Sequence, residues 1–143
     1  MDLGGWDPHV AQGGAEGPMA NLMGQLAQGL AAFYEDLQDR MQRVTLVVMS
    51  EFGRRAQENG GLGTDHGHGN MMMVMGGGIH GGNVYADWPG LHDAQVVGPG
   101  DLAITTDYRD VIGELLHKRL NNPLVADIFP GYKVNELGLA VFG

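Results

Sequence analysis

Hydrophobic residues recur at spacings of three and four through the first third of the chain. The positions that follow this spacing are Met19, Leu22, Met23, Leu26, Leu30, Phe33, Tyr34, Leu37 and Met41. One face of an α-helix repeats with this period, so the pattern predicts an amphipathic helix from about Pro18 to Met41. Pro18 suits the first helical turn, where the N–H that proline lacks would have no partner within the helix.

Two short segments, residues 44–49 and 71–75, are almost continuously apolar. Such runs are typical of strands that are buried on both faces, as in a parallel sheet. A last helix is predicted after Thr105 or Thr106, either of which could cap it, and before residues 121–123. The order helix, strand, long loop, strand, helix predicts a single α/β domain that spans residues 1–143.

Composition narrows the possible functions. The chain has 8 basic and 17 acidic residues, a formal net charge of −9, which argues against nucleic acids and against an anionic membrane surface as partners. It has no cysteine, which excludes disulfides and thiolate zinc sites. No apolar run reaches the roughly 18 residues of a membrane span. The first residues lack the features of a signal peptide, and the compartment is left open.

The strongest chemical signal is the segment Thr64-Asp65-His66-Gly67-His68-Gly69-Asn70. One carboxylate and two imidazoles lie within four residues, and glycines beside them allow the backbone to turn sharply. These side chains suit zinc, manganese or iron, so Asp65, His66 and His68 are predicted metal ligands. The alternative is an exposed polar loop whose histidines bind nothing.

Two further segments add candidates. Asp7 and His9 flank Pro8, which stiffens the loop between them, and could supply two more ligands. Glu51, Arg54 and Arg55 follow the first predicted strand; the carboxylate could reach a metal, and the guanidinium groups could bind an oxyanion. The alternative for the two arginines is pairing with surplus carboxylates of the chain.

Several short motifs occur in a characteristic order. They are Gly4-Gly5-Trp6-Asp7-x-His9, Ser50-Glu51-Phe52-Gly53-Arg54-Arg55, Gly63-Thr64-Asp65-His66-Gly67, Gly76-Gly77-Gly78 with Gly81-Gly82, and Gly100-Asp101-Leu102 followed by Thr105-Thr106-Asp107-Tyr108-Arg109. In this order they resemble the C-terminal portion of the bacterial "domain of unknown function 1501" family. That family is similar to the alkaline phosphatase and sulfatase superfamily.

The resemblance implies a parallel-sheet α/β sandwich, like the C-terminal half of an alkaline phosphatase-like fold, with metals at the strand ends. Enzymes of that superfamily hydrolyse phosphate or sulfate esters at two divalent metals. By the match, Asp7 and His9 would serve one metal, while Asp65 and His66 would serve the second. In another register Glu51 would supply the carboxylate of that second pair, and His68 would add a ligand in either.

In the superfamily, the Ser or Thr nucleophile and a metal-binding aspartate belong to an N-terminal part, and we expect this chain to begin after it. We therefore expect a truncated, metal-binding, hydrolase-like domain that acts on a small anionic ester only weakly or not at all. The alternative is a non-catalytic anion-binding or assembly module. A shortened sheet would expose a strand edge, which predicts a homo-oligomer. Relatives are often exported, which would suit a periplasmic parent protein.

Overall fold

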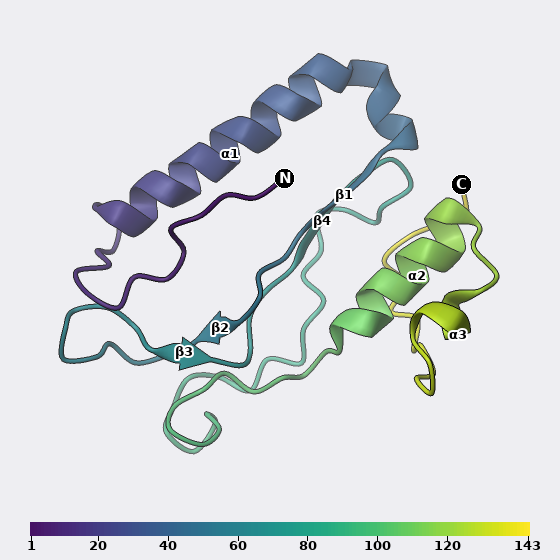
Figure 1. The fold of residues 1–143 in the computed structure, drawn as a ribbon. Coiled ribbons are helices and arrows are strands. Elements are labelled where there is room, and N and C mark those ends of the chain that lie inside the picture. The colour runs from purple at the N-terminus through teal and green to yellow at the C-terminus, as the bar shows by residue number, and fades with distance from the viewer. The chain divides into compact units, whose positions relative to one another are not determined.

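The computed structural model describes residues 1–143. Its helices are α1 (Pro18–Leu37), the 3-10 helix η1 (Gln38–Arg43), α2 (Tyr108–Leu120) and α3 (Val125–Ile128). Its strands are β1 (Thr45–Val48), β2 (Gly53–Arg54), β3 (His66–Gly67) and β4 (Met73–Gly76) (Figure 1). None of the helices combines the length and the hydropathy that crossing a membrane requires.

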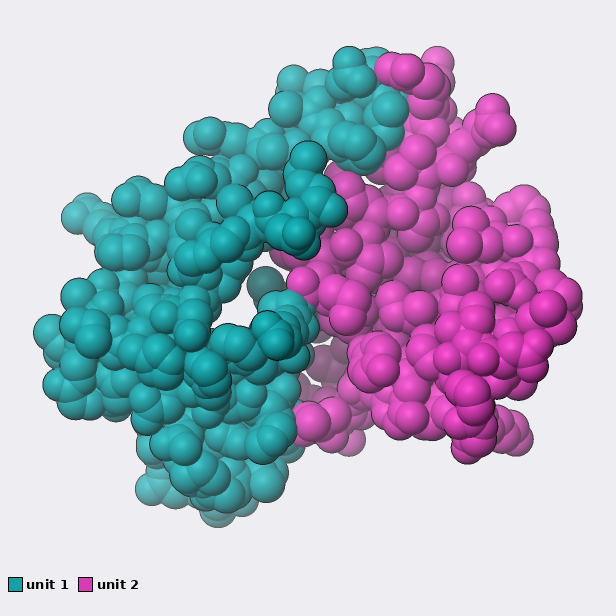
Figure 2. Space-filling view, in the orientation of Figure 1, with its two compact units in different colours: residues 1–38, 50–71, 89–103 teal, residues 39–49, 72–88, 104–143 magenta.

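The chain forms two compact units, each assembled from three separate stretches (Figure 2). Unit 1 contains residues 1–38, 50–71 and 89–103, and therefore holds α1, β2 and β3. Unit 2 contains residues 39–49, 72–88 and 104–143, and holds η1, β1, β4, α2 and α3. Every candidate site residue predicted from the sequence belongs to unit 1.

Both predicted helices are confirmed, with altered ends. Helix α1 begins at Pro18, but its α-helical part ends at Leu37 and η1 continues the chain to Arg43. Helix α2 is capped by Asp107 rather than by either threonine, since the Asp107 carboxylate accepts a hydrogen bond from the Arg109 N–H. It ends at Leu120, just before the predicted stop, and its C-cap Asn121 adopts the left-handed conformation.

The prediction of a parallel-sheet α/β sandwich, like the C-terminal half of an alkaline phosphatase-like fold, is wrong. Strand β1 pairs antiparallel with β4, with Thr45 opposite Gly76 and Val48 opposite Met73. Strand β2 likewise pairs antiparallel with β3, so each sheet has only two strands. The two apolar runs do form strands, but a continuous apolar run carries no information on the direction of its neighbour.

The hydrophobic core of unit 2 lies between α2 and the C-terminal segment. Val111 and Leu115 of α2 pack with Leu139 and Ala140, and side chains of β1 and β4 cover this cluster. The carboxylate of Glu114, on the same face of α2, is fully buried. It accepts hydrogen bonds from the backbone N–H groups of residues 137, 138 and 140 at 2.6–3.0 Å, and from Lys118 at 2.9 Å. This glutamate therefore joins the C-terminal segment to α2.

Candidate functional site

Backbone pairing within unit 1 aligns the N-terminal segment with the loop between β2 and β3. The N–H groups of Ala11 and Gln12 donate to the carbonyls of Gly61 and Leu62 at 2.9 and 2.8 Å, and Val10 forms an antiparallel bridge with Leu62. Gly63 permits this approach, because a Cβ there would lie 2.3 Å from the carbonyl carbon of His9. The pairing places residues 7–9 beside the start of β3.

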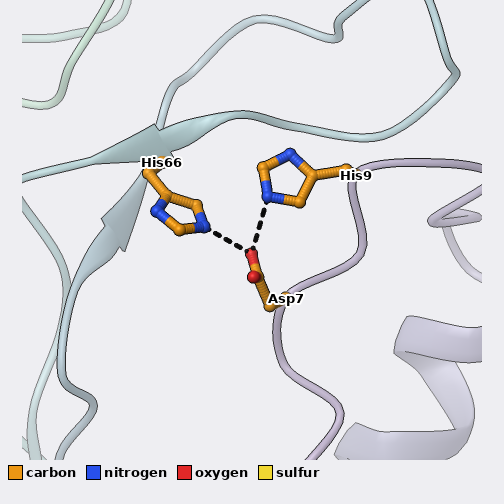
Figure 3. A group of neighbouring side chains, drawn as sticks. All are labelled: Asp7, His9 and His66. Atoms are coloured by element: carbon orange, nitrogen blue, oxygen red, sulfur yellow. Dashed lines mark hydrogen bonds and ion pairs between the residues drawn. The ribbon is translucent and has the colours of Figure 1, made fainter.

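Three predicted ligands converge at this point: Asp7, His9 and His66 (Figure 3). The Nε2 atoms of His66 and His9 lie 2.9 and 3.1 Å from the same oxygen, Oδ1 of Asp7. One potential ligand atom from each residue lies within 4.8 Å of the others. Each of the three side chains is about half exposed, so the cluster is open to solvent.

Two neighbours orient the members of this cluster. The ring of Phe52 stacks on the imidazole of His66, with 4.0 Å between ring centroids and an interplanar angle of 23°. The guanidinium of Arg54 donates a hydrogen bond to Oδ1 of Asp7 through Nη1. Its Nε donates to Oγ1 of Thr64 at 2.9 Å, and Nη2 donates to the carbonyl of Thr64. A stacked ring and a forked cation thus hold the imidazole and the carboxylate toward each other.

Asp65, the fourth predicted ligand, lies on the other side of His9. Its Oδ1 faces Nδ1 of His9 at 3.6 Å, and Nδ2 of Asn59 donates to the same oxygen at 2.9 Å. Asn59 also donates to the carbonyl of His9 at 3.0 Å, which joins the two loops directly. Asp65 therefore faces Nδ1 of His9, the ring nitrogen that does not face Asp7. Carboxylates often occupy this position, outside the first shell of ligands, when a histidine binds a metal.

The electrostatics of the cluster keep both aspartates ionised. Partial desolvation would raise the pKa of Asp7, but hydrogen bonds from His66 and Arg54, with the nearby imidazole charges, lower this pKa below its usual value. The hydrogen bond from Asn59 is the main cause that lowers the pKa of Asp65, with smaller contributions from His9 and Arg55. Both carboxylates can therefore accept a cation over a wide pH range.

The remaining predicted ligands lie outside the three-residue cluster. Nδ1 of His68 contacts Oδ2 of Asp101 at 2.7 Å, while 80% of the His68 side chain is exposed. Glu51 is exposed and makes no hydrogen bond or ion pair. The structure thus brings Asp7, His9 and His66 together, with Asp65 behind His9, and it does not bring Glu51 to them.

Both arginines that were considered for anion binding are engaged with carboxylates. Arg54 contacts Asp7, and Arg55 contacts Asp65 through Nη1 at 3.2 Å. Nε of Arg55 also faces Oδ1 of Asp101 at 3.6 Å. Both arginines therefore pair with the chain's own acidic residues, which is the alternative considered for them from the sequence.

Two residues that were not predicted from the sequence, Asn59 and Asp101, also contribute to the site. Asn59 is followed by Gly60 and Gly61, a combination that marks a turn in which the side-chain amide bonds nearby backbone. Its Oδ1 indeed accepts from the N–H groups of Gly61 and Gly63. Asp101 lies between Gly100 and Leu102 and gave no comparable local signal, since its partners are Arg55 and His68.

Comparison with protein families gives one match. The family model described as "Protein of unknown function (DUF1501)" matches residues 1–120, a range that includes every residue of the cluster. Searches of curated proteins and of solved structures gave no significant match.

Proposed function

Because the chain belongs to the DUF1501 family of proteins of unknown function, we propose its function from the chemistry of the cluster: Asp7, His9 and His66 bind a divalent metal ion such as zinc or manganese. The observation that carries this proposal is the convergence of two imidazole nitrogens and a carboxylate in a patch open to solvent. Two histidines with one carboxylate form a common ligand set of catalytic zinc sites.

The donor atoms are spaced suitably for an ion. Around tetrahedral zinc, with bonds of about 2.0–2.1 Å, neighbouring donor atoms lie about 3.3 Å apart. The separations of 2.9 and 3.1 Å from the two Nε2 atoms to Oδ1 of Asp7 are slightly shorter than this. The ligand atoms of the two histidines lie within 4.8 Å of each other. Small movements of the three exposed side chains would therefore admit the ion, and solvent would complete its coordination.

Local charge favours a cation over an anion. The connected ion pairs contain three carboxylates, those of Asp7, Asp65 and Asp101, and two guanidinium groups, those of Arg54 and Arg55. With neutral imidazoles, the group therefore has an excess of one negative charge. A divalent cation reverses this excess, whereas an oxyanion would add to it and would have to displace carboxylates from both arginines.

The resemblance to alkaline phosphatases and sulfatases suggests phosphate or sulfate esters as the wider chemical context. A bound ion would supply Lewis-acid polarisation of an ester oxygen. The hydroxyl of Thr64, which could act as a nucleophile, already has two hydrogen-bond partners. Its Oγ1 accepts from Arg54 and donates to Oε1 of Gln12 at 2.8 Å. The hydroxyl of Ser50 donates to the carbonyl of Phe52. We therefore propose metal binding by this chain, with little or no ester hydrolysis by the chain alone.

Calorimetric titration of the chelator-treated protein with Zn²⁺ tests the proposal. The wild-type chain should bind the ion, and the His9→Ala/His66→Ala variant should lose this binding. His92→Ala is the matched control, because His92 is an exposed histidine of the same unit whose ring makes no hydrogen bond or ion pair. The proposal fails if the wild type binds no Zn²⁺, or if the double variant binds as the wild type does.

A further inference from the structure

One arginine of unit 1 contacts two carboxylates, each of which faces a histidine. Arg55 reaches Oδ2 of Asp65 through Nη1 at 3.2 Å, and Oδ1 of Asp101 through Nε at 3.6 Å. The other oxygen of each carboxylate faces an imidazole Nδ1: His9 at 3.6 Å from Asp65, and His68 at 2.7 Å from Asp101. The guanidinium of Arg55 thus stands at the centre of two aspartate–histidine pairs.

Backbone contacts hold the three segments around this arginine. The N–H of Arg55 donates to the carbonyl of Asp65 at 3.0 Å, and Arg55 forms an antiparallel bridge with Asp101. Gly67 lets the chain pass closely, because a Cβ there would lie 2.8–3.0 Å from the backbone of Arg54 and Arg55. The arginine and both aspartates are therefore placed by the main chain and not only by their side chains.

Burial indicates that Asp101 depends on Arg55. Only 9% of the Asp101 side chain is exposed, and its Oδ1 has no hydrogen-bond partner. Nε of Arg55, which faces this oxygen, is likewise buried without a hydrogen bond. A buried carboxylate oxygen is costly unless a charge or donor compensates it, so the ion pair with Arg55 accounts for its position.

We propose that Arg55 is a positioning residue: it holds Asp65 behind His9, a ligand of the proposed metal site, and Asp101 behind His68, which lies outside that site, so that Nδ1 of each imidazole faces a carboxylate. This inference rests on the proposed metal binding. A carboxylate at Nδ1 selects the tautomer that carries its proton there and leaves the Nε2 lone pair for a ligand. At His9, Nε2 would bind the metal ion that Asp7 and His66 also bind. At His68, Nε2 belongs to a ring that is exposed to solvent.

Without metal, the two rings should carry their protons on different nitrogens. His68 should carry its proton on Nδ1, since Asp101 contacts that nitrogen at 2.7 Å. In neutral His9 the closer carboxylate is Asp7, at Nε2, so this ring should carry its proton there without metal. Binding of Zn²⁺ at Nε2 should move the His9 proton to Nδ1, where Asp65 accepts it.

Nitrogen-15 NMR, recorded at a pH at which the imidazoles are neutral, shows which ring nitrogen carries the proton. Zn²⁺ titration of the same variants measures the affinity. Arg55→Met should lower Zn²⁺ affinity by up to the about 10- to 100-fold that losing an outer-shell partner such as Asp65 costs, although Arg55 touches none of the three ligands. It should also disturb the ring signals of His68 without metal, and those of His9 in the Zn²⁺-loaded protein, where the His9 proton lies on Nδ1 beside Asp65. Asp101→Asn should alter His68 alone, and Asp65→Asn should alter His9 alone. Arg43→Met, at an exposed arginine outside unit 1, should change neither.

Arg55→Met leaves Asp101 buried without its cation and could unfold the chain. The double variant Arg55→Met/Asp101→Asn removes both charges, and it should still show the lowered Zn²⁺ affinity and the altered His9 signals. Arg55→Lys, which keeps the charge but loses the fork, should recover part of the affinity. Unchanged His68 signals in Arg55→Met, or unchanged His9 signals in both Zn²⁺-loaded arginine-free variants, would overturn the inference. Absence of Zn²⁺ binding by the wild type would overturn the metal proposal instead, because the His68 signals are read without metal.

Discussion

Each unit of the molecule holds a network of carboxylates, cations and imidazoles, and the two networks differ in what satisfies the carboxylate. In unit 2, Glu114 has no exposed surface, and three backbone N–H groups together with Lys118 occupy its oxygens. In unit 1, Asp7 is about half exposed, and side chains alone contact it: those of His9, His66 and Arg54.

This difference separates a structural carboxylate from one that can exchange partners. Backbone donors cannot turn away, so Glu114 can lose its partners only if the C-terminal segment leaves α2. Exposed imidazoles can rotate, so Asp7 and its neighbours can give up contacts with one another for contacts with an ion. The same residue types therefore support stability in unit 2 and ligand binding in unit 1.

The largest expected effect is that of Glu114→Ala on stability. The change leaves three backbone N–H groups without their acceptor and Lys118 with Glu136 alone, so the free energy of unfolding should fall by about 3 kcal/mol or more. Urea denaturation measures the loss. Glu58→Ala, at an exposed glutamate without a partner, is the matched control and should stay within about 0.5 kcal/mol of the wild type. A loss below about 1 kcal/mol for Glu114→Ala would mean that Glu114 is not a structural carboxylate.

Asp7→Asn should greatly weaken Zn²⁺ binding and should hardly change stability, the opposite of what is expected for a structural carboxylate such as Glu114. Zn²⁺ affinity should fall by more than the about 10- to 100-fold that loss of an outer-shell partner costs, because Asp7 would be a direct ligand. Stability should change little, since Asp7 is half exposed and its partners can turn to solvent. Calorimetric titration and urea denaturation of one preparation give both numbers. Full Zn²⁺ affinity combined with a large loss of stability would reverse the comparison of the two networks.

Acid should weaken the network of unit 2 in a defined direction. Burial would raise the pKa of Glu114, but the hydrogen bonds from Lys118 and from the backbone N–H groups of Ala140 and Leu137 lower it below its usual 4.5. Hydrogen bonds from His117 and then from Lys118 lower the pKa of Glu136 in the same way. The unfolded chain therefore binds more protons on acidification, and the stabilisation, complete above about pH 4.5, is lost as pH falls through the folded values.

The Glu136→Gln variant isolates one part of this acid sensitivity. Wild type and variant should differ most in stability near neutral pH, and the difference should shrink as pH falls below about 4.5. Urea denaturation at a series of pH values measures it. A difference that stays constant down to pH 3 would show that the ionised Glu136 carboxylate does not stabilise unit 2.

The smallest effect is expected for Glu51→Gln. In one of the two alignments with the family motifs, Glu51 was a predicted metal ligand. Its side chain is exposed, however, and is not part of the Asp7–His9–His66 cluster. Zn²⁺ affinity should therefore equal that of the wild type by calorimetry. A clear loss of affinity would restore Glu51 as a ligand and require the loop after β1 to adopt another arrangement when metal binds.

Local patterns in the sequence predicted the helices well, because a helix is built from contacts three and four residues apart. The apolar period before Met41 and the stop signal after α2 were correct within a few residues, whereas Asp107, and neither of the two predicted threonines, caps α2. The fully buried Glu114 was missed, although a signal existed: it lies three residues after Val111 and next to Leu115, on the apolar face of α2. A charged residue on that face predicts a buried partner, and here the partner is a segment more than 20 residues away.

By itself, the sequence determined the residue types of the site, the helix spans and the two apolar strands. Tertiary structure decided which of them meet: the antiparallel pairing of β1 with β4, the approach of Asp7 to His66 across 59 residues, and the central place of Arg55 between two aspartates. Local periodicity encodes which face of an element is buried, but not which distant segment covers it. That choice depends on backbone pairing and side-chain packing formed only in the folded chain.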